Sequence, residues 1–296
     1  MTFTHVSVMP EQVLAHWVTD PSGLYLDATL GGGGHSHLLL SQFPDCRLIA
    51  IDQDPAAVSQ AHDRLGAWSS RVSIRQGNFR RLDDILSPDE KGAVQGILFD
   101  LGVSSPQLDQ MARGFGYQNI DAPLDMRMDP DNPVTAFRLV NMKPREDIIR
   151  ALKEWGEERW ASRIADFIVS AREKEPIRTT GQLVELIKAA IPASARRTGG
   201  HPARRTFQAL RIWVNDELAA LKQGLAAAID VAAPKGHIVA ISFQSLEDRI
   251  VKHTFREWQA SQRGIVVTRR PLIPSPEEIE SNPRSHSAKL RAFAKG

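Results

Sequence analysis

Short apolar runs alternate with segments of helical spacing over the first third of the chain. The apolar runs predict buried strands over residues 24–30, 48–51, 72–76 and 96–102. Apolar residues at helical spacing predict helices over residues 10–17, 34–42, 55–65 and 82–86. Strands that alternate with helices are typical of a parallel, doubly wound α/β sheet, because each crossover between parallel strands needs a helix. The ligand site of such a sheet lies at the carboxyl ends of its strands.

This alternation stops after residue 104, and mainly helical patterns take its place until about residue 203. They predict helices over residues 136–140, 145–156, 158–173 and 180–190. A helical stretch inside a strand–helix alternation indicates an inserted domain. We therefore expect a helical insertion over residues 108–207, between the two parts of an α/β domain at residues 1–107 and 208–296.

The α/β pattern returns towards the end of the chain. Apolar spacing predicts one long helix over residues 205–231, a strand over 237–243 and a helix over 246–258. Two further strands, over residues 265–268 and 289–294, are expected to form an antiparallel edge of the sheet.

Four successive glycines, Gly31 to Gly34, follow the first predicted strand, and Asp52 ends the second. Glycines let the backbone adopt positive φ and let a ligand approach closely, and the helix behind them presents free N–H groups. An acidic residue after the second strand suits ribose hydroxyls. The pyrophosphate pattern is met only nominally, and the loop has no P-loop lysine. A nucleoside cofactor without a pyrophosphate, such as S-adenosylmethionine, therefore fits at least as well as NAD.

Four strand ends converge in this arrangement. The glycines, Asp52, Phe79 and Asp100 each follow a different predicted strand. Because the carboxyl ends of parallel strands meet at one edge of the sheet, we expect these residues to form one site.

Composition and charge narrow the class of protein. The chain has 296 residues, a net charge of +2 and one cysteine, Cys46, which suits a reducing cytoplasm. No apolar run approaches the ~20 residues of a membrane helix, and the first residues lack the pattern of a secretion signal. Residues 186–215 contain six Lys or Arg and no acid, and from Arg249 onward ten Lys or Arg accompany four Glu. Basic segments of this kind favour phosphate contacts with nucleic acid.

Five longer motifs closely resemble one family. They are residues 26–36 (LDATLGGGGHS), 100–109 (DLGVSSPQLD), 123–128 (PLDMRM), 205–212 (RTFQALRI) and 245–252 (SLEDRIVK). In this order they resemble the bacterial 16S ribosomal RNA cytosine-N4 methyltransferase family, also called MraW or RsmH. The resemblance implies a class I (Rossmann-like) methyltransferase fold that uses S-adenosylmethionine. It further implies methylation of the exocyclic N4 amine of a cytidine in the decoding region of the small subunit.

The resemblance also assigns roles to residues. It places the cofactor against Gly33, Gly34, His35, Asp52, Phe79, Asp100 and Gln107. The segment after the fourth strand would hold the target amine, with Asp100, Ser104, Ser105 and Pro106 as catalytic candidates. Candidates for binding the RNA are Phe115, Tyr117, Arg204 and Arg205. Two positions depart from the family pattern, since Gln244 and His286 stand where the family usually has His and Arg.

Alternative functions stay open at this point. A nicotinamide-dependent oxidoreductase uses the same strand–helix–strand logic, and an RNA-binding module could retain an inactive cofactor fold. No metal cluster or nucleophilic cysteine is expected. The expected partner is 16S ribosomal RNA, in an assembling or assembled small subunit, and the sequence leaves homodimerisation open.

Overall fold

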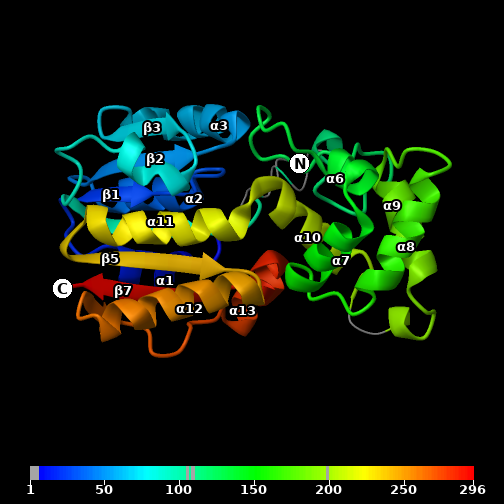
Figure 1. The fold of residues 1–296 in the computed structure, drawn as a ribbon. Helices are drawn as coiled ribbons and strands as arrows, with labels where there is room; N and C mark the ends of the chain where they lie inside the picture. The colour runs from blue at the N-terminus through cyan, green and yellow to red at the C-terminus, as the bar shows by residue number, and fades with distance from the viewer. Residues whose placement is uncertain (1–6, 105–106, 108–110, 198–199) are drawn as a thin grey trace. The chain divides into compact units, whose positions relative to one another are not determined.

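The computed structural model describes residues 7–104, 107, 111–197 and 200–296 (Figure 1). It divides into two compact units, Met1–Ser104 with Leu218–Gly296, and Ser105–Glu217. The second unit thus extends to Glu217, whereas the sequence suggested a return to the first domain at residue 208.

The first unit contains a seven-stranded sheet in the order β3-β2-β1-β4-β5-β7-β6. Its strands are β1 (Leu24–Asp27), β2 (Arg47–Asp52), β3 (Val72–Gln76), β4 (Val94–Asp100), β5 (Ala232–Ser242), β6 (Gly264–Val266) and β7 (Lys289–Lys295). The first five strands pair in parallel, and β7 is antiparallel to both β5 and β6. The predicted mostly parallel α/β sheet with an antiparallel edge is therefore confirmed.

Helices cover both faces of this sheet, which explains why its central strands β1, β2 and β4 are largely apolar. One face packs against α1 (Pro10–Trp17), α2 (Gly34–Gln42) and α3 (Pro55–Leu65), and the other against α4 (Leu82–Ile85), α11 (Glu217–Val231) and α12 (Ser245–Ala260). Side chains alternate between the two cores along each strand. Tyr25, Leu48 and Leu98 face the α1 side, whereas Leu26, Ile49 and Ile97 face the α11 side.

The second unit is helical in the part that the structure describes. Its helices are α6 (Ala136–Met142), α7 (Arg145–Glu154), α8 (Ala161–Arg172), α9 (Thr180–Ala190) and α10 (Arg204–Asn215). Helix α9 begins with a capping box, in which Thr179 and Gln182 each bond the other's backbone N–H. This local signal explains why the sequence located α9 correctly.

The long helix predicted over residues 205–231 is wrong, because the chain breaks between α10 and α11. Asp216 adopts a left-handed conformation with φ 50°. Asn215 next to it is buried, and its side-chain amide donates to Met126 O and Arg211 O while its oxygen accepts from Met128 N. Asn and Asp tolerate such local bonding and the left-handed region better than other non-glycine residues. Apolar spacing alone does not detect the break, since it continues across it.

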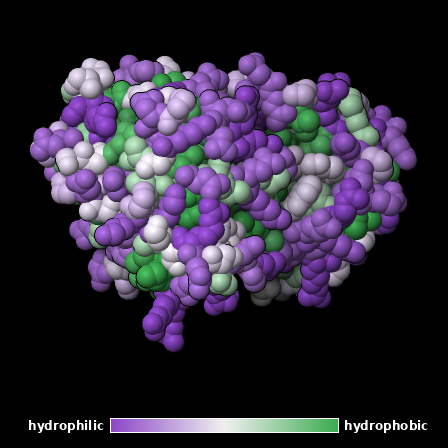
Figure 2. Space-filling model, turned by 60° about the vertical axis from the view of Figure 1, so that its left-hand side comes forward, coloured by the Kyte–Doolittle hydropathy of each residue, from purple (hydrophilic) through white to green (hydrophobic). Residues whose placement is uncertain are grey.

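No helix in the described ranges is long and apolar enough to cross a membrane. On the face drawn in Figure 2, hydrophilic residues predominate and apolar residues form small scattered groups.

Candidate functional site

The glycine loop between β1 and α2 has a fixed conformation that requires glycine. Gly31 and Gly33 have φ of 48° and 69°, which L side chains rarely adopt. Gly31 N donates to Asp52 Oδ2 at 2.7 Å, and Arg64 Nη1 donates to Gly32 O at 2.9 Å. The loop is therefore held from β2 and α3 and is not a loose surface turn.

Asp52, at the end of β2, holds this loop and retains capacity for a ligand. Its Oδ1 accepts from Asp54 N at 2.9 Å, and its Oδ2 accepts from Gly31 N. Each carboxylate oxygen has a second lone pair, and the side chain is partly exposed. Burial raises the pKa of Asp52 to about 6, against the lowering effect of the two backbone hydrogen bonds. The carboxylate can therefore accept hydrogen bonds from ligand hydroxyls without losing its bonds to the loop.

Asp27 is a buried carboxylate at the end of β1 that the site prediction did not include. It is 2% exposed, and it accepts from Ser36 Oγ at 2.6 Å and from Thr29 N at 3.2 Å. Burial raises its pKa to about 6, which the Ser36 hydrogen bond opposes. Asp27 thus ties the end of β1 to the first turn of α2. In the sequence, the signal that could have identified Asp27 was a carboxylate inside an apolar run.

His35 and Asp100 face each other at the end of β4. His35 Nε2 lies 3.5 Å from Asp100 Oδ2, and the two side chains are 5% and 27% exposed. Both ring nitrogens of His35 and Asp100 Oδ1 are buried without a hydrogen-bond partner among the described residues. Buried polar atoms are nearly always hydrogen-bonded, so these three atoms indicate a polar ligand. Thr29 Oγ1 accepts a hydrogen bond from Asp100 N at 2.6 Å, at the last residue of β4.

Phe79, three residues after the end of β3, is half-buried beside the same strand ends. Its ring lies edge-on to Phe99 of β4, with centroids 5.5 Å apart. A Cβ on Gly224 of α11 would lie 2.6 Å from Phe79 Cδ2, so the helix backbone packs tightly against the ring. Asn78 precedes Phe79 and donates to Gln53 Oε1 at 2.6 Å, which joins the ends of β2 and β3.

Among the expected cofactor residues of the first unit, direct contacts bring His35 to Asp100 and tie Asp52 to the glycine loop. Gly31 of the loop bonds Asp52, and His35 meets Asp100, while Ser104 Cβ would lie 3.5 Å from a Cβ on Gly31. Gln107 is buried and belongs to the second unit. Ser105 and Pro106 lie outside the described residues.

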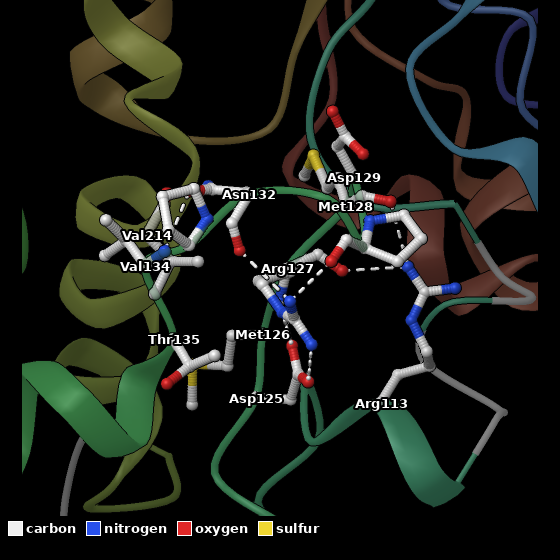
Figure 3. Close-up of polar contacts among 12 residues, drawn as sticks. Arg113, Asp125, Met126, Arg127, Met128, Asp129, Asn132, Val134, Thr135 and Val214 are labelled. Atoms are coloured by element: carbon white, nitrogen blue, oxygen red, sulfur yellow. Dashed lines mark hydrogen bonds and ion pairs between the residues drawn. The ribbon is translucent and has the colours of Figure 1, made fainter.

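In the second unit a polar cluster fixes the loop of the predicted PLDMRM motif (Figure 3). Arg127 forms a two-pronged ion pair with Asp125 and donates to Asn132 O at 3.0 Å. Hydrogen bonds from Arg127 lower the pKa of Asp125, although its burial acts in the opposite direction. Arg113 Nη2 donates to Arg127 O and Met128 O at 2.8 and 3.0 Å. These contacts hold residues 111–128 as one loop.

The RNA-binding candidates of this unit have different environments. Phe115 is buried, with Arg113 Cζ 5.8 Å from its ring centroid. Tyr117 is partly exposed and stacks on His201, with centroids 4.3 Å apart and ring planes at 7°. Arg204 and Arg205 are exposed in the first turn of α10.

Comparison with known proteins shows matches over the whole chain. The model of the MraW methylase family matches residues 2–296. A Ribosomal RNA small subunit methyltransferase H from Symbiobacterium thermophilum is 50% identical over 311 residues, which cover 100% of this chain and 98% of that protein. A protein of the same name from Brevibacillus brevis is 47% identical, over 100% of this chain and 99% of its own.

A solved ribosomal RNA methylase from Streptococcus thermophilus superposes over 97% of this chain and 93% of that one, with a TM-score of 0.43 and 9% identity. The family model and the two relatives each span essentially the full length of this chain. The chain therefore belongs to the MraW methylase family of S-adenosylmethionine-dependent methyltransferases.

Proposed function

We propose that this protein transfers a methyl group from S-adenosylmethionine to the exocyclic N4 amine of a cytidine in the decoding region of 16S ribosomal RNA. Relatives at about half identity over the full chain are named small-subunit ribosomal RNA methyltransferases. The observation that carries the proposal is the set of unpartnered buried atoms on His35 and Asp100, beside a loop that requires glycine.

The residues at the strand ends fit the cofactor in chemistry. The loop backbone at Gly33 and Gly34 would meet its methionine end, and Asp52 would accept its ribose hydroxyls. Phe79 would pack against the adenine, and the Asp100 carboxylate favours a cationic ligand. When bound, S-adenosylmethionine supplies an electrophilic methyl group on a sulfonium. Gln107 completes the set that the family resemblance implies.

The cytosine amine is a poor nucleophile, because its lone pair is delocalised into the ring. The protein must therefore hold the amine close and in line, and positioning of this kind is a large catalytic contribution. Carboxylate and hydroxyl oxygens of Asp100 and Ser104 would accept hydrogen bonds from the amine and direct its lone pair towards the methyl group. Ser105 and Pro106 would shape the same segment.

The helical second unit would supply recognition of the RNA. Residues 186–215 carry six basic and no acidic side chains, which suits phosphate contacts. A base in folded RNA must leave its stack to reach a methyl donor. The substrate would be an assembling or assembled small subunit, and the reaction would take place in the cytoplasm.

Mass spectrometry of nucleosides tests this proposal. Purified protein and S-adenosylmethionine are incubated with small subunits, or with naked 16S ribosomal RNA, from cells that lack the modification. We expect N4-methylcytidine at one site, and we expect Asp100→Asn to lower its yield while Asp63→Asn, an exposed carboxylate of α3, does not. Methylation at another atom or base would refute the N4 assignment.

Calorimetry separates the two alternative functions. Binding of S-adenosylhomocysteine without binding of NAD(H) is expected, and the reverse would favour an oxidoreductase. RNA binding with an intact cofactor site and no methyl transfer on either substrate would favour a non-catalytic RNA-binding module.

A further inference from the structure

We propose that the stacked rings of Tyr117 and His201, together with Arg204 and Arg205, form a nucleotide subsite for ribosomal RNA that is distinct from the place of the target cytosine. The rings would stack one base of the RNA, and the arginines would bind its backbone phosphates. The inference rests on the proposed function, since it assumes an RNA substrate.

The geometry of the ring pair is that of a stacking platform. The Tyr117 and His201 rings are nearly parallel at 7° and 4.3 Å, and both are partly exposed. Phe207, which is buried in α10, supports Tyr117 edge-on at 5.8 Å. Proteins that bind unpaired nucleotides use such exposed rings, because every base offers a flat face.

His201 also has a donor available to the ligand. Its Nδ1 accepts from Ala203 N at 3.3 Å, so in the neutral ring the proton is on Nε2. Burial and the nearby Lys188 charge lower the pKa of His201, which favours this neutral form. Nε2 has no hydrogen-bond partner in the part of the chain that the structure describes, and it can donate to a base or a phosphate.

The charge that follows His201 closely in the sequence suits an anion. Within the described residues, Arg204 makes no ion pair, and the one hydrogen bond of the Arg205 side chain goes to the carbonyl oxygen of Glu157, at 3.2 Å. The first turn of α10 contains no acidic residue, and none occurs anywhere in residues 186–215. Two exposed guanidinium groups without a carboxylate partner are the arrangement that phosphate recognition uses.

The loop that carries Tyr117 is tied to α10 at two places. Tyr117 contacts Phe207 near the start of the helix, and Asn215 at its end accepts from Met128 N at 2.8 Å. Arg113 holds the two ends of the loop together through its bonds to the Arg127 and Met128 carbonyls. A site held in this way loses little conformational freedom when it binds.

The same contacts limit which ring faces of this unit a base can reach. One face of Tyr117 is covered by His201, and Phe115 is buried. A base of the RNA would therefore stack on a ring face that the Tyr117–His201 pair leaves open.

The test compares affinity for naked 16S ribosomal RNA, and KM and kcat with unmethylated small subunits. The variants are Tyr117→Ala, His201→Ala, Arg204→Gln with Arg205→Gln, and Tyr117→Phe. We expect the two alanine variants to weaken RNA binding and raise KM about tenfold, while kcat, the affinity for S-adenosylhomocysteine and the thermal midpoint stay unchanged. Tyr117→Phe should behave as wild type, because it keeps the stack.

The arginine double variant provides an electrostatic measurement that loss of packing would not change. Each lost phosphate contact lowers the slope of log affinity against log salt by about 0.7–0.9. We expect a decrease of one to two such steps, and none for Lys153→Gln, which removes an exposed charge on α7.

Wild-type RNA affinity and salt slope in the folded arginine variant would overturn the subsite. So would unchanged RNA binding in Tyr117→Ala and His201→Ala. These outcomes leave the proposed function intact if the wild-type protein still produces N4-methylcytidine. If the wild-type protein forms no N4-methylcytidine, the proposed function is overturned, but the measured RNA binding still stands.

Discussion

The imidazole of His35, at the start of α2, and the carboxylate of Asp100, at the end of β4, lie 3.5 Å apart. Within the described residues, the two ring nitrogens of His35 make no hydrogen bond, and Asp100 Oδ1 makes none either. Leaving these buried polar atoms without hydrogen bonds costs free energy when no ligand is bound. In the proposed function, the cofactor would provide the missing donors and acceptors.

Asp100→Asn should weaken cofactor binding without unfolding the protein. It keeps the shape of the side chain, but it removes the negative charge and turns one acceptor into a donor. A charge-assisted hydrogen bond contributes roughly 1.5–3 kcal/mol. We expect the affinity for S-adenosylhomocysteine to fall about tenfold or more in calorimetry. Asp63→Asn serves as the control, and wild-type affinity in Asp100→Asn would remove Asp100 from the site.

Gly33→Ala should destabilise the glycine loop, because Gly33 has φ of 69°. A non-glycine residue in the left-handed region costs about 1–2 kcal/mol. We expect a thermal midpoint lower by several degrees and weaker binding of S-adenosylhomocysteine. Gly66→Ala is the matched control, since a Cβ there meets nothing within 4 Å and the residue is already right-handed helical. If both variants have the same midpoint, the backbone conformation of Gly33 does not restrict the residue type.

Asp27 should make the ligand-free protein less stable as pH rises between about 4 and 7. Its pKa is about 6 when folded and 3.8 as a model value, so the folded state binds more protons in this range. Stability is then greatest below pH 4 with respect to this group, and it decreases until the folded carboxyl has ionised near pH 6. The shift of about two units corresponds to about 3 kcal/mol as an upper bound.

Thermal midpoints at pH 5 and pH 7.5 measure this effect. Asp27→Asn keeps an acceptor for the Ser36 hydroxyl but cannot ionise, so its midpoint should change less between the two pH values than that of the wild type. An equal change in both proteins would show that Asp27 does not titrate in this range.

Asn215→Ala should loosen the second unit and leave the cofactor site intact. The buried amide bonds Met126 O, Arg211 O and Met128 N, and alanine would leave these groups unsatisfied at about 1–3 kcal/mol each. We expect faster limited proteolysis within residues 111–135 and unchanged affinity for S-adenosylhomocysteine. Lys222→Ala on the exposed side of α11 is the control. Wild-type resistance to proteolysis would mean that Asn215 does not hold the loop.

Local patterns in the sequence determined the architecture of this protein. Strands β2 and β4 were predictable because they are short apolar runs, as expected for strands buried on both faces, and such runs are properties of neighbouring residues. Strand β3 is only partly buried. The glycine loop and Asp52 were identifiable for the same reason, since each lies at the end of a predicted strand. Helix α9 could be located from its capping box alone.

Only the tertiary structure decided what depends on residues far apart in the chain. The break at Asp216 depends on hydrogen bonds between Asn215 and residues near 126, which apolar spacing cannot register. The pairing of His35 with Asp100, and of Tyr117 with His201, joins residues from separate elements whose approach is set by packing. The raised pKa of Asp27 likewise follows from burial between β1 and α2. The sequence determines which elements form because their signals are local, whereas the orientation of the site's side chains depends on how these elements pack.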